Sequence, residues 1–366
     1  MKKFYATVID KLVAIYRALP NHKIHSIDPK SFRHRPQSIL VIANTALGDA
    51  LLCTPGMQSL RNSFPETKIH ALIHRNYIPL FENVDYLDSI IPYHGGYRKF
   101  WSTLAKIRQT RPDTVLIFHG NGPQDLQLAA LSGARYILKH PNRSQRKHLL
   151  SCDIQRTNQH TIENKLHLVR AIGGKQLIRT MAIAPLDNHE LEQRFAAFQG
   201  AVGLQLGAAD RYKMWPVERF AELAKRLFDE HPTRQIVLTG IKEERPLAGK
   251  FLQLCPDKRV VNLCGQTSIQ ELPYLLKQFA CLVTNDTGTM HLAVALRLPV
   301  LALFSATRSE KIGPYQDREL HKVIQKNGSD IHALPKKERD DRAMRLIEVD
   351  EVYQALVLLL NSNQKK

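Results

Sequence analysis

The sequence predicts an α/β protein made of two doubly wound domains, each with a mostly parallel sheet. In both halves of the chain, short apolar runs alternate with stretches of helical periodicity, which is typical of repeated βα units. A length of 366 residues allows two domains, each large enough for its own hydrophobic core. The pattern changes around residues 185–200, where a Pro, Asp and Asn cluster precedes a charged helix, so we expect the domain boundary there.

We expect four segments along the chain: an N-terminal helix and lead-in over 1–37, a first domain over 38–188, a second over 189–345 and a closing helix over 346–366. The first helix is predicted from near-helical spacing of apolar residues over 3–19, and Pro20 ends it. Such a helix either docks on the body of the protein, the commoner outcome, or lies on a membrane surface.

In the first half, apolar runs predict the strands Ser38–Ala43, Lys68–Ile73, Ser89–Pro92, Thr114–Phe118 and Arg135–Leu138. A turn, Asn44–Gly48, and a helix from Asp49 to about Asn62 should follow the first strand. Gly48 permits close approach of a ligand. The helix dipole favours the charged form of Asp49, which makes that carboxylate available as a base. Alternatively, Asp49 is a dipole partner without chemistry.

Two further polar stretches of the first half are candidate contacts for an anionic acceptor. His119 begins the turn HGNGPQ at the end of the strand Thr114–Phe118. Arg143 and Arg146 belong to the basic run NRSQRKHLL, which is either a solvated surface or, beside a cleft, an attraction for an acidic molecule.

In the second half, strands are expected over Ala201–Leu206, Gln235–Thr239, Arg259–Asn262, Cys281–Thr284 and from Pro299, with helices over Glu190–Phe198, Val217–Glu230 and from Met290 to about Arg297. The turn between the strand Cys281–Thr284 and its helix should lie at the carboxyl edge of the sheet. A helix that begins after Thr287 and Gly288 directs backbone N–H groups there, so a phosphate is the expected occupant. Asp286 should face sugar hydroxyls and His291 should donate to the anion, unless the two are only a helix cap and a surface residue.

Composition restricts the partners and the compartment. The formal net charge of +18 indicates an acidic partner: nucleic acid, an anionic membrane surface or a phosphorylated substrate. Nucleic acid is not favoured, because no zinc-ligand pairs or RNA-binding aromatic run occur. The five scattered cysteines are expected to be free thiols in a reducing compartment. No run is apolar enough to span a membrane, and charged residues interrupt the N-terminal apolar stretch, so we expect a cytoplasmic protein.

Three stretches together resemble glycosyltransferase family 9, the ADP-heptose:lipopolysaccharide heptosyltransferases: ILVIANTALGDALLCTPGMQSLRNSFP, GLQLGAADRYKMWPVERFAELAKRL and VTNDTGTMHLAVALRLPVLALFSAT. The resemblance covers roughly residues 38–310. It implies the GT-B architecture, two Rossmann-like domains facing each other across a cleft, with the acceptor bound by the first and the donor nucleotide by the second. It also implies inverting transfer of heptose from ADP-heptose to the lipopolysaccharide inner core, with no cofactor and no strict need for a metal.

The resemblance also assigns residues. Asp49 of the L-G-D motif matches the general base, and Lys213 of the K-x-W-P element matches the lysine that contacts the donor phosphates and assists catalysis. Glu244 matches the acid that binds ribose hydroxyls, with Glu243 a close competitor. The D-T-G-x-x-H donor motif corresponds to Asp286, Thr287, Gly288 and His291. The chain departs from many relatives at three positions, Ala43, Ala208 and Ala209.

The resemblance implies a nucleotide-sugar donor, an anionic lipopolysaccharide core acceptor and peripheral contact with the inner face of the bacterial inner membrane, with no nucleic-acid partner. Two alternatives stay open at this point. One is a family 9 transferase with another donor sugar or acceptor. The other is a non-catalytic protein that binds a nucleotide sugar or a nucleic acid on the same scaffold.

Overall fold

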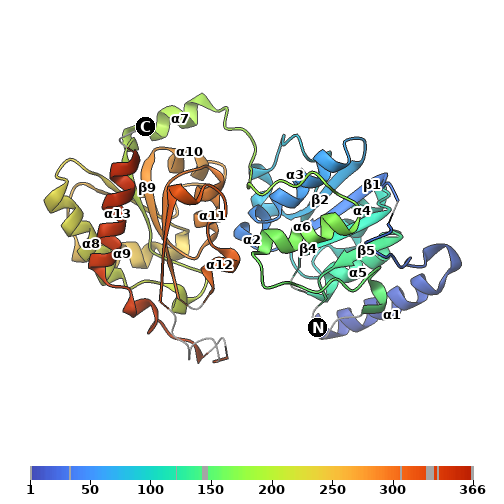
Figure 1. The fold of residues 1–366 in the computed structure, drawn as a ribbon. Coiled ribbons are helices and arrows are strands. Elements are labelled where there is room, and N and C mark those ends of the chain that lie inside the picture. The colour runs from blue at the N-terminus through green and yellow to red at the C-terminus, as the bar shows by residue number, and fades with distance from the viewer. Residues whose placement is uncertain are drawn as a thin grey trace. The chain divides into compact units, whose positions relative to one another are not determined.

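The protein is an α/β chain that divides into two compact units, Met1–Pro185 and Leu186–Lys366 (Figure 1). The computed structural model describes residues 2–32, 34–120, 122–141, 147–305, 307–326, 334–335 and 338–363. The first helix and lead-in are grouped with the first unit and the closing helix with the second. Each unit contains one parallel sheet with helices packed on it.

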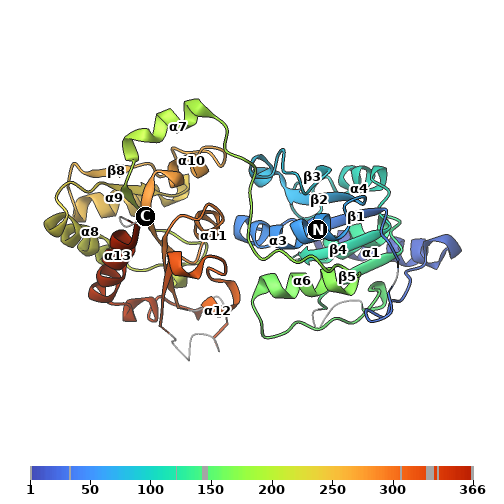
Figure 2. The ribbon, with the colours of Figure 1, turned by 45° about the horizontal axis from the view of Figure 1, so that its top comes forward.

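The first unit has a five-stranded sheet of order β3-β2-β1-β4-β5. Every residue of β1 is buried, as expected for the central strand of a parallel sheet covered on both faces. One core cluster joins the sheet to α4, α5 and α1, while α3 and α6 pack against each other (Figure 2). The strands are β1 (Ser38–Ala43), β2 (Lys68–His74), β3 (Ser89–Tyr93), β4 (Thr114–His119) and β5 (Tyr136–Lys139), and the helices are α1 (Lys2–Ala18), α2 (Leu47–Leu51), α3 (Thr54–Ser63), α4 (Phe100–Gln109), α5 (Pro123–Leu131) and α6 (Thr161–Ala171).

The second unit has a six-stranded sheet of order β11-β10-β9-β6-β7-β8. Its main core cluster joins the sheet to α8, α9 and α13. The strands are β6 (Ala201–Gln205), β7 (Ile236–Thr239), β8 (Val260–Asn262), β9 (Phe279–Asn285), β10 (Val300–Phe304) and β11 (His321–Gln325), and the helices are α7 (His189–Phe195), α8 (Val217–Glu230), α9 (Arg245–Leu254), α10 (Leu272–Lys277), α11 (Gly288–Ala295), α12 (Ser309–Ile312) and α13 (Val349–Asn363). Short 3-10 turns include Arg211–Lys213 and Lys242–Glu244.

The fold class predicted from the sequence is confirmed, because both sheets are parallel and have the strand order of the Rossmann fold. Strand β1 and helix α8 have the predicted bounds, and the other predicted strands are present with small shifts. Strand β11 was not predicted, because its sequence HKVIQ mixes polar and apolar residues. The closing helix begins at Val349 rather than Leu346, since the Glu348 backbone N–H donates to the Glu351 side chain and starts the helix there.

The single helix predicted from Asp49 to about Asn62 is wrong. Two helices, α2 and α3, occupy this stretch, and Asp49 lies within the five-residue α2. Pro55 has no N–H to continue the helical hydrogen bonds, and the Thr54 hydroxyl donates to the Leu51 carbonyl oxygen at 2.8 Å instead. The carboxylate therefore lacks a long helix behind it, and its neighbours set its charge state.

The cysteines and the apolar character of the helices can be compared with what the composition predicts. All five cysteines are free, and four of them are buried. In the described part of the chain, no helix is both long and apolar enough to cross a bilayer.

His321 gives a testable pH dependence of stability. It begins β11, is 6% exposed, and neither ring nitrogen has a hydrogen-bond partner among the described residues. Burial lowers its pKa from 6.5 to about 4, against the opposing charges of Asp317 and Glu319. Between these values the unfolded chain binds more protons, so His321 should cost stability as the pH falls from 6.5 to about 4. In urea unfolding, the variant His321→Leu should lose less stability than the unchanged protein over this pH range. The difference in the free energy of unfolding should be roughly 3 kcal/mol at most. An unchanged pH slope in the variant would contradict the expectation.

Candidate functional site

In each sheet, most of the predicted site residues follow strands that flank the point where the strand order reverses. That point lies between β1 and β4 in the first unit and between β6 and β9 in the second. Doubly wound sheets bind ligands at the carboxyl ends of the strands there. Gly48 and Asp49 follow β1, and His119 ends β4. Lys213 follows β6, Glu244 follows β7, and the stretch from Asp286 to His291 follows β9.

Asp49 is the centre of a hydrogen-bonded cluster in the first unit. Nδ1 of His119 lies 2.8 Å from its Oδ1, and the Thr45 hydroxyl donates to its Oδ2 at 2.9 Å. The same Thr45 oxygen lies 3.1 Å from Nδ1 of His119, so the three side chains contact one another. Burial alone would raise the pKa of Asp49, but His119, Thr45 and the charge of Lys165 outweigh it and lower the pKa to about 2. The carboxylate is therefore ionised throughout the neutral range.

Lys165 is a buried lysine whose charge interacts with this cluster. It lies on α6, is 5% exposed, and interacts electrostatically with Cys53 and Asp49. Burial lowers the pKa of Lys165, and both partners oppose that effect. Lys165 in turn contributes to the lowered pKa of Asp49.

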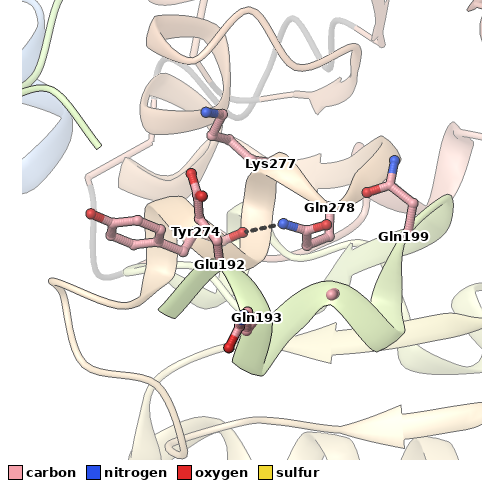
Figure 3. Close-up of a pocket in the computed structure, with 7 residues that line it drawn as sticks. Glu192, Gln193, Gln199, Tyr274, Lys277 and Gln278 are labelled. Atoms are coloured by element: carbon pink, nitrogen blue, oxygen red, sulfur yellow. Dashed lines mark hydrogen bonds between the residues drawn. The ribbon is translucent and has the colours of Figure 1, made fainter. Parts of the chain in front are cut away.

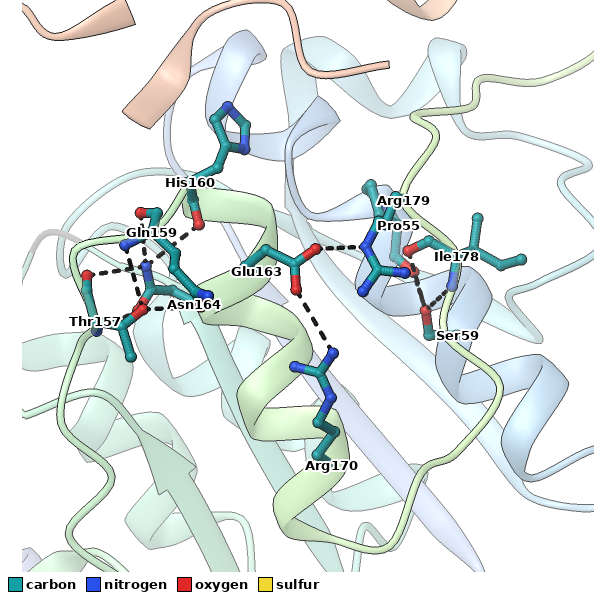
Figure 4. Close-up of polar contacts among 10 residues, drawn as sticks. All are labelled: Pro55, Ser59, Thr157, Gln159, His160, Glu163, Asn164, Arg170, Ile178 and Arg179. Carbon is teal, nitrogen blue, oxygen red and sulfur yellow. Dashed lines mark hydrogen bonds and ion pairs between the residues drawn. The ribbon is translucent and has the colours of Figure 1, made fainter. Parts of the chain in front are cut away.

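Polar contacts hold α6 in place (Figure 4). Nε of Arg179 donates to Glu163 at 2.6 Å, and Arg170 lies 3.6 Å from the other oxygen of that carboxylate. The Ser59 hydroxyl on α3 accepts from the Ile178 backbone N–H at 2.8 Å. The segment after α6 is therefore bonded to both α3 and α6, which fixes the helix that carries Lys165.

An asparagine bonds the end of β1 to the loop after β4. Nδ2 of Asn44 donates to the fully buried carboxylate of Asp125 at 2.5 Å, and Asp125 also accepts from the Gly122 backbone N–H. Gly120 leaves the space for this carboxylate, because a Cβ there would lie 2.2 Å from its Oδ2. These contacts fix the loop that follows His119.

In the second unit, Lys213 and Asp286 form an ion pair. Nζ of Lys213 lies 2.6 Å from Oδ2 of Asp286, which also accepts from the Thr307 hydroxyl at 2.7 Å. Both side chains are largely buried, with 17% and 7% of the side chain exposed for Lys213 and Asp286. In the described residues both hydrogen bonds go to Oδ2, so Oδ1 can accept another donor.

Helix α11 begins directly after this pair. The Thr287 hydroxyl caps it by accepting from the Met290 backbone N–H at 3.3 Å, and Gly288 is its first residue. His291 lies in the first turn and is 5% exposed. The first amides of a helix have no partner within that helix and favour an anion.

Glu244 occupies a space that two glycines leave open. A Cβ at Gly207 would lie 1.8 Å from its Oε1, and a Cβ at Gly240 would lie 2.3 Å from its Oε2. Oε2 accepts from Nε2 of Gln205 at 2.9 Å and from the Ile241 backbone N–H at 3.0 Å. Burial raises the pKa of Glu244. The competitor Glu243 is exposed, so Glu244 is the acid that reaches the strand ends.

Asn285 connects the loops of the second unit at the end of β9. It is fully buried, accepts from the Trp215 backbone N–H at 3.0 Å, and donates to the Leu206 carbonyl oxygen at 2.9 Å. Its amide also lies within hydrogen-bond distance of the carbonyl oxygens of Gln205 and Gly207. One side chain thus fixes the segment after β6 and the K-x-W-P element that carries Lys213.

Sequence reasoning did not find several supporting residues: Thr45, Lys165, Gly207, Asn285 and Thr307. The contact between His119 and Asp49 was also not predicted, although polar residues at the ends of two adjacent strands were a signal for it. The predicted acceptor contacts Arg143 and Arg146 lie outside the described residues.

A pocket between α7 and α10 contains none of these residues (Figure 3). Glu192 and Lys277 are among its lining side chains, and Nε2 of Gln278 donates to the Tyr274 carbonyl oxygen beside them. It lies apart from the β6–β9 strand ends and is not a candidate site.

Asn285→Ala should destabilise the second unit. The substitution leaves the buried Trp215 N–H without its partner and removes the bonds to the segment after β6, at a cost of about 3 kcal/mol. Chemical unfolding measures the loss. Asn62→Ala, at an exposed position on α3, is the matched control and should change stability by less than about 0.5 kcal/mol. Equal effects of the two substitutions would contradict the role of Asn285.

The family model of glycosyltransferase family 9 (heptosyltransferase) matches residues 141–344. Lipopolysaccharide heptosyltransferase 3 of Escherichia coli is 23% identical over 340 residues, covering 86% of this chain and 97% of that protein. Lipooligosaccharide heptosyltransferase 2 of Haemophilus influenzae is 31% identical over 119 residues, and this match spans only 32% of this chain and 33% of that protein.

Among solved structures, the Escherichia coli ADP-heptose lps heptosyltransferase II has a TM-score of 0.73 at 20% identity, over 89% of this chain and 99% of that chain. A family 9 glycosyltransferase from Veillonella parvula has a TM-score of 0.74 at 20% identity, over 89% and 97%. These likenesses show a shared fold, the GT-B architecture of two Rossmann-like domains. Because the family model covers more than half of the chain, this protein belongs to glycosyltransferase family 9 and is a transferase enzyme.

Proposed function

We propose that the protein transfers a heptose from ADP-heptose to the core of lipopolysaccharide, with inversion at the anomeric carbon. The observation that carries the proposal is the charge at the two strand-order reversals. The first unit holds an ionised carboxylate, Asp49, and the second holds a cation, Lys213, beside a helix N-terminus. A direct displacement needs two parts. One is a base for the acceptor hydroxyl, and the other is a set of cationic and hydrogen-bond-donating groups for the departing diphosphate.

In this mechanism Asp49 takes the proton of the acceptor hydroxyl. The acceptor oxygen forms its bond to the anomeric carbon as the bond from that carbon to the phosphate oxygen breaks, and ADP leaves with the electron pair. Gly48 permits close approach of the acceptor to the carboxylate. His119 and Thr45 hold both carboxylate oxygens and set their direction. Arg143 and Arg146 stay predicted acceptor contacts.

Lys213, the first amides of α11 and His291 meet the negative charge that develops on the diphosphate. Fixed donors aimed at developing charge are usually the largest catalytic contribution. Asp286 orients the Lys213 ammonium group through Oδ2, and its Oδ1 is available to a donor sugar hydroxyl. Thr287 and Gly288 begin the helix that supplies the amides. No metal is needed for this charge, and no D-x-D motif occurs in the sequence.

Glu244 is proposed to accept the ribose hydroxyls of the donor. It lies beside the end of β6 through its contact with Gln205, at the edge of the sheet where α11 also begins. The acceptor core is assembled on a lipid, so we place the enzyme at the cytoplasmic face of the inner membrane. Transfer of a different sugar, or transfer to a different acceptor, is the second candidate, because Asp49, Lys213 and the amides of α11 would act on groups that other nucleotide sugars and acceptors share.

A mass-spectrometric assay tests the proposal as a whole. The full chain is incubated with ADP-heptose and delipidated lipopolysaccharide core, and the expected product carries the added mass of one heptose with release of ADP. Transfer from another nucleotide sugar alone would favour the second candidate. Absence of transfer from every nucleotide sugar would contradict an enzymatic role for this chain.

The variants Asp49→Asn and His119→Ala distinguish the role of the base, Asp49, from the role of the histidine that supports it. Asp49→Asn should lower kcat by about 100- to 10,000-fold, because the proton acceptor is lost. His119→Ala should lower it less, since Thr45 and Lys165 still favour the ionised carboxylate. Affinity for ADP should not change in either variant, because the proposed nucleotide contacts belong to the other unit. If His119→Ala removes transfer as completely as Asp49→Asn does, His119 rather than Asp49 takes the proton.

Gly207→Ala tests the position of Glu244. The new Cβ would displace the carboxylate, which lies 1.8 Å from that point, so the affinity for ADP should fall about tenfold, the equivalent of one lost hydrogen bond to a charged group. Calorimetric titration of ADP measures the change. Gly249→Ala is the matched control, because nothing beyond its chain neighbours and the backbone of its own helix lies within 4 Å of its added Cβ. Equal ADP affinities in the two variants would show that Glu244 does not contact the nucleotide.

A further inference from the structure

Exposed apolar side chains concentrate on the first helix. The described residues leave eleven large apolar side chains exposed, and six of them lie between Phe4 and Leu19. Phe4 is 70% exposed and Ile15 is 66% exposed. Spacings of three and four residues place these side chains on one face of α1 and its C-terminal extension. The complete set is Phe4, Tyr5, Val8, Leu12, Ile15 and Leu19.

The opposite face of α1 is anchored to the first unit. Ile9 and Val13 are buried in the core that includes α5, beside which α1 lies in Figure 1. Nη1 of Arg17 donates to the Ala134 carbonyl oxygen at 2.9 Å, and Gln127 donates to Asp10 at 2.7 Å. The helix is thus fixed with its apolar face outward, so docking on the protein leaves most of that face exposed in the described chain.

A tryptophan on the neighbouring helix α4 is also exposed. Trp101 on α4 is 54% exposed. A series of aromatic contacts connects it to α1, with ring centroids 6.4 Å apart for Tyr5 and Tyr97, 5.8 Å for Tyr97 and Phe100, and 5.3 Å for Phe100 and Trp101. Tryptophan and tyrosine are enriched where a membrane meets water, because their rings are apolar and carry one polar group.

The part of the chain that carries Tyr97, Phe100 and Trp101 is basic. Residues 89–112 contain five Lys or Arg and no Asp or Glu. Burial lowers the pKa of His94, and the charges of four exposed basic residues lower it further. These cations are Arg75, Arg98, Lys99 and Lys106. Each basic residue near an anionic bilayer strengthens binding by about fivefold.

We propose that this face of α1 and α4 binds the surface of an anionic lipid bilayer. We call it the lipid-facing surface and define it as Phe4, Tyr5, Val8, Leu12, Ile15, Leu19 and Trp101 with the cations Arg75, Arg98, Lys99 and Lys106. It extends the proposed function, which places the acceptor on a membrane, by naming the surface that contacts the lipid. A second copy of the chain is a poorer occupant, since the net charge of +18 opposes self-association.

Amphipathic helices of this kind lie in the plane of the interface with the apolar side chains among the headgroups and the first part of the acyl chains. Lysine and arginine side chains at the margin reach the phosphates while their alkyl stems cover apolar surface. The 17 residues of α1 are fewer than the roughly 20 that a spanning helix needs, and its opposite face is bonded to α5. The surface therefore adsorbs to a bilayer without crossing it.

Tryptophan fluorescence provides a direct test with the full-length protein. The chain has two tryptophans, and Trp215 is 1% exposed, so a change on adding vesicles reports Trp101. Vesicles of phosphatidylcholine with about 30% phosphatidylglycerol should shift the emission to shorter wavelength, and brominated lipid should quench it. Vesicles of phosphatidylcholine alone should bind at least tenfold more weakly, because the electrostatic attraction is missing.

Two variants test the two parts of the surface. Phe4→Ser combined with Leu12→Ser and Ile15→Ser removes exposed apolar groups and should weaken binding to the anionic vesicles at least tenfold. Arg98→Glu combined with Lys106→Glu should weaken it mainly at low salt. Leu346→Ser combined with Leu358→Ser is the matched control, because both side chains are exposed in the second unit, and its binding should equal that of the unchanged protein.

Three results would overturn the inference: no binding to anionic vesicles, equal binding by the triple serine variant, or a dimer in light scattering that the triple serine variant converts to a monomer. Transfer to a delipidated acceptor, measured on the same proteins, separates this inference from the proposed function. Loss of vesicle binding with unchanged transfer is the expected result for the triple serine variant. Vesicle binding by a protein that transfers no sugar would support the surface and contradict the proposed function.

Discussion

The constraint on which the candidate site depends is the reversal of strand order beside the first strand of each sheet. Strand β1 lies between β2 and β4, and β6 lies between β7 and β9, so the loops that follow these strands leave on opposite sides. Buried asparagines then fix the diverging loops. Asn44 bonds the loop after β4 through Asp125, and Asn285 bonds the segment after β6. Without these bonds, the segments after β4 and β6 would adopt several conformations, and the side chains of His119 and Lys213 could not be held in one direction.

The two units fix charges of opposite sign by similar means. In the first unit, Asp49 stays ionised because His119, Thr45 and Lys165 outweigh the effect of burial. In the second, Asp286 holds the ammonium group of Lys213 while Thr307 holds Asp286. In each case a hydroxyl and a nitrogen-bearing side chain, His119 or Lys213, share one carboxylate, which limits its rotation. A preorganised site of this kind does not need to reorient its dipoles when charge develops in the reaction.

Much of the fold was predictable from the sequence, because the buried strands of a parallel sheet are short apolar runs between turns. Helix α8 was predicted with its bounds because its periodicity is strong. The break between α2 and α3 was missed, since helical apolar spacing continues through it and the decisive contact is the Thr54 hydroxyl on the Leu51 carbonyl oxygen.

Of the candidate site, the positions after strand ends were predictable, and the supporting contacts were not. The pairs His119–Asp49 and Gly207–Glu244 join residues far apart in the chain, and no local pattern specifies such contacts. A residue such as Lys165 gives no sequence signal at all, because its importance comes from burial beside a charge.

Helix α1 is anchored to the first unit before it meets any lipid. Because α1 is already ordered by Arg17 and the α5 core, its adsorption to a bilayer would lack the entropy loss and the gain in helical circular dichroism that accompany a peptide folding on lipid. Association would therefore be a rigid-body event, with a rate set by diffusion and charge rather than by helix formation.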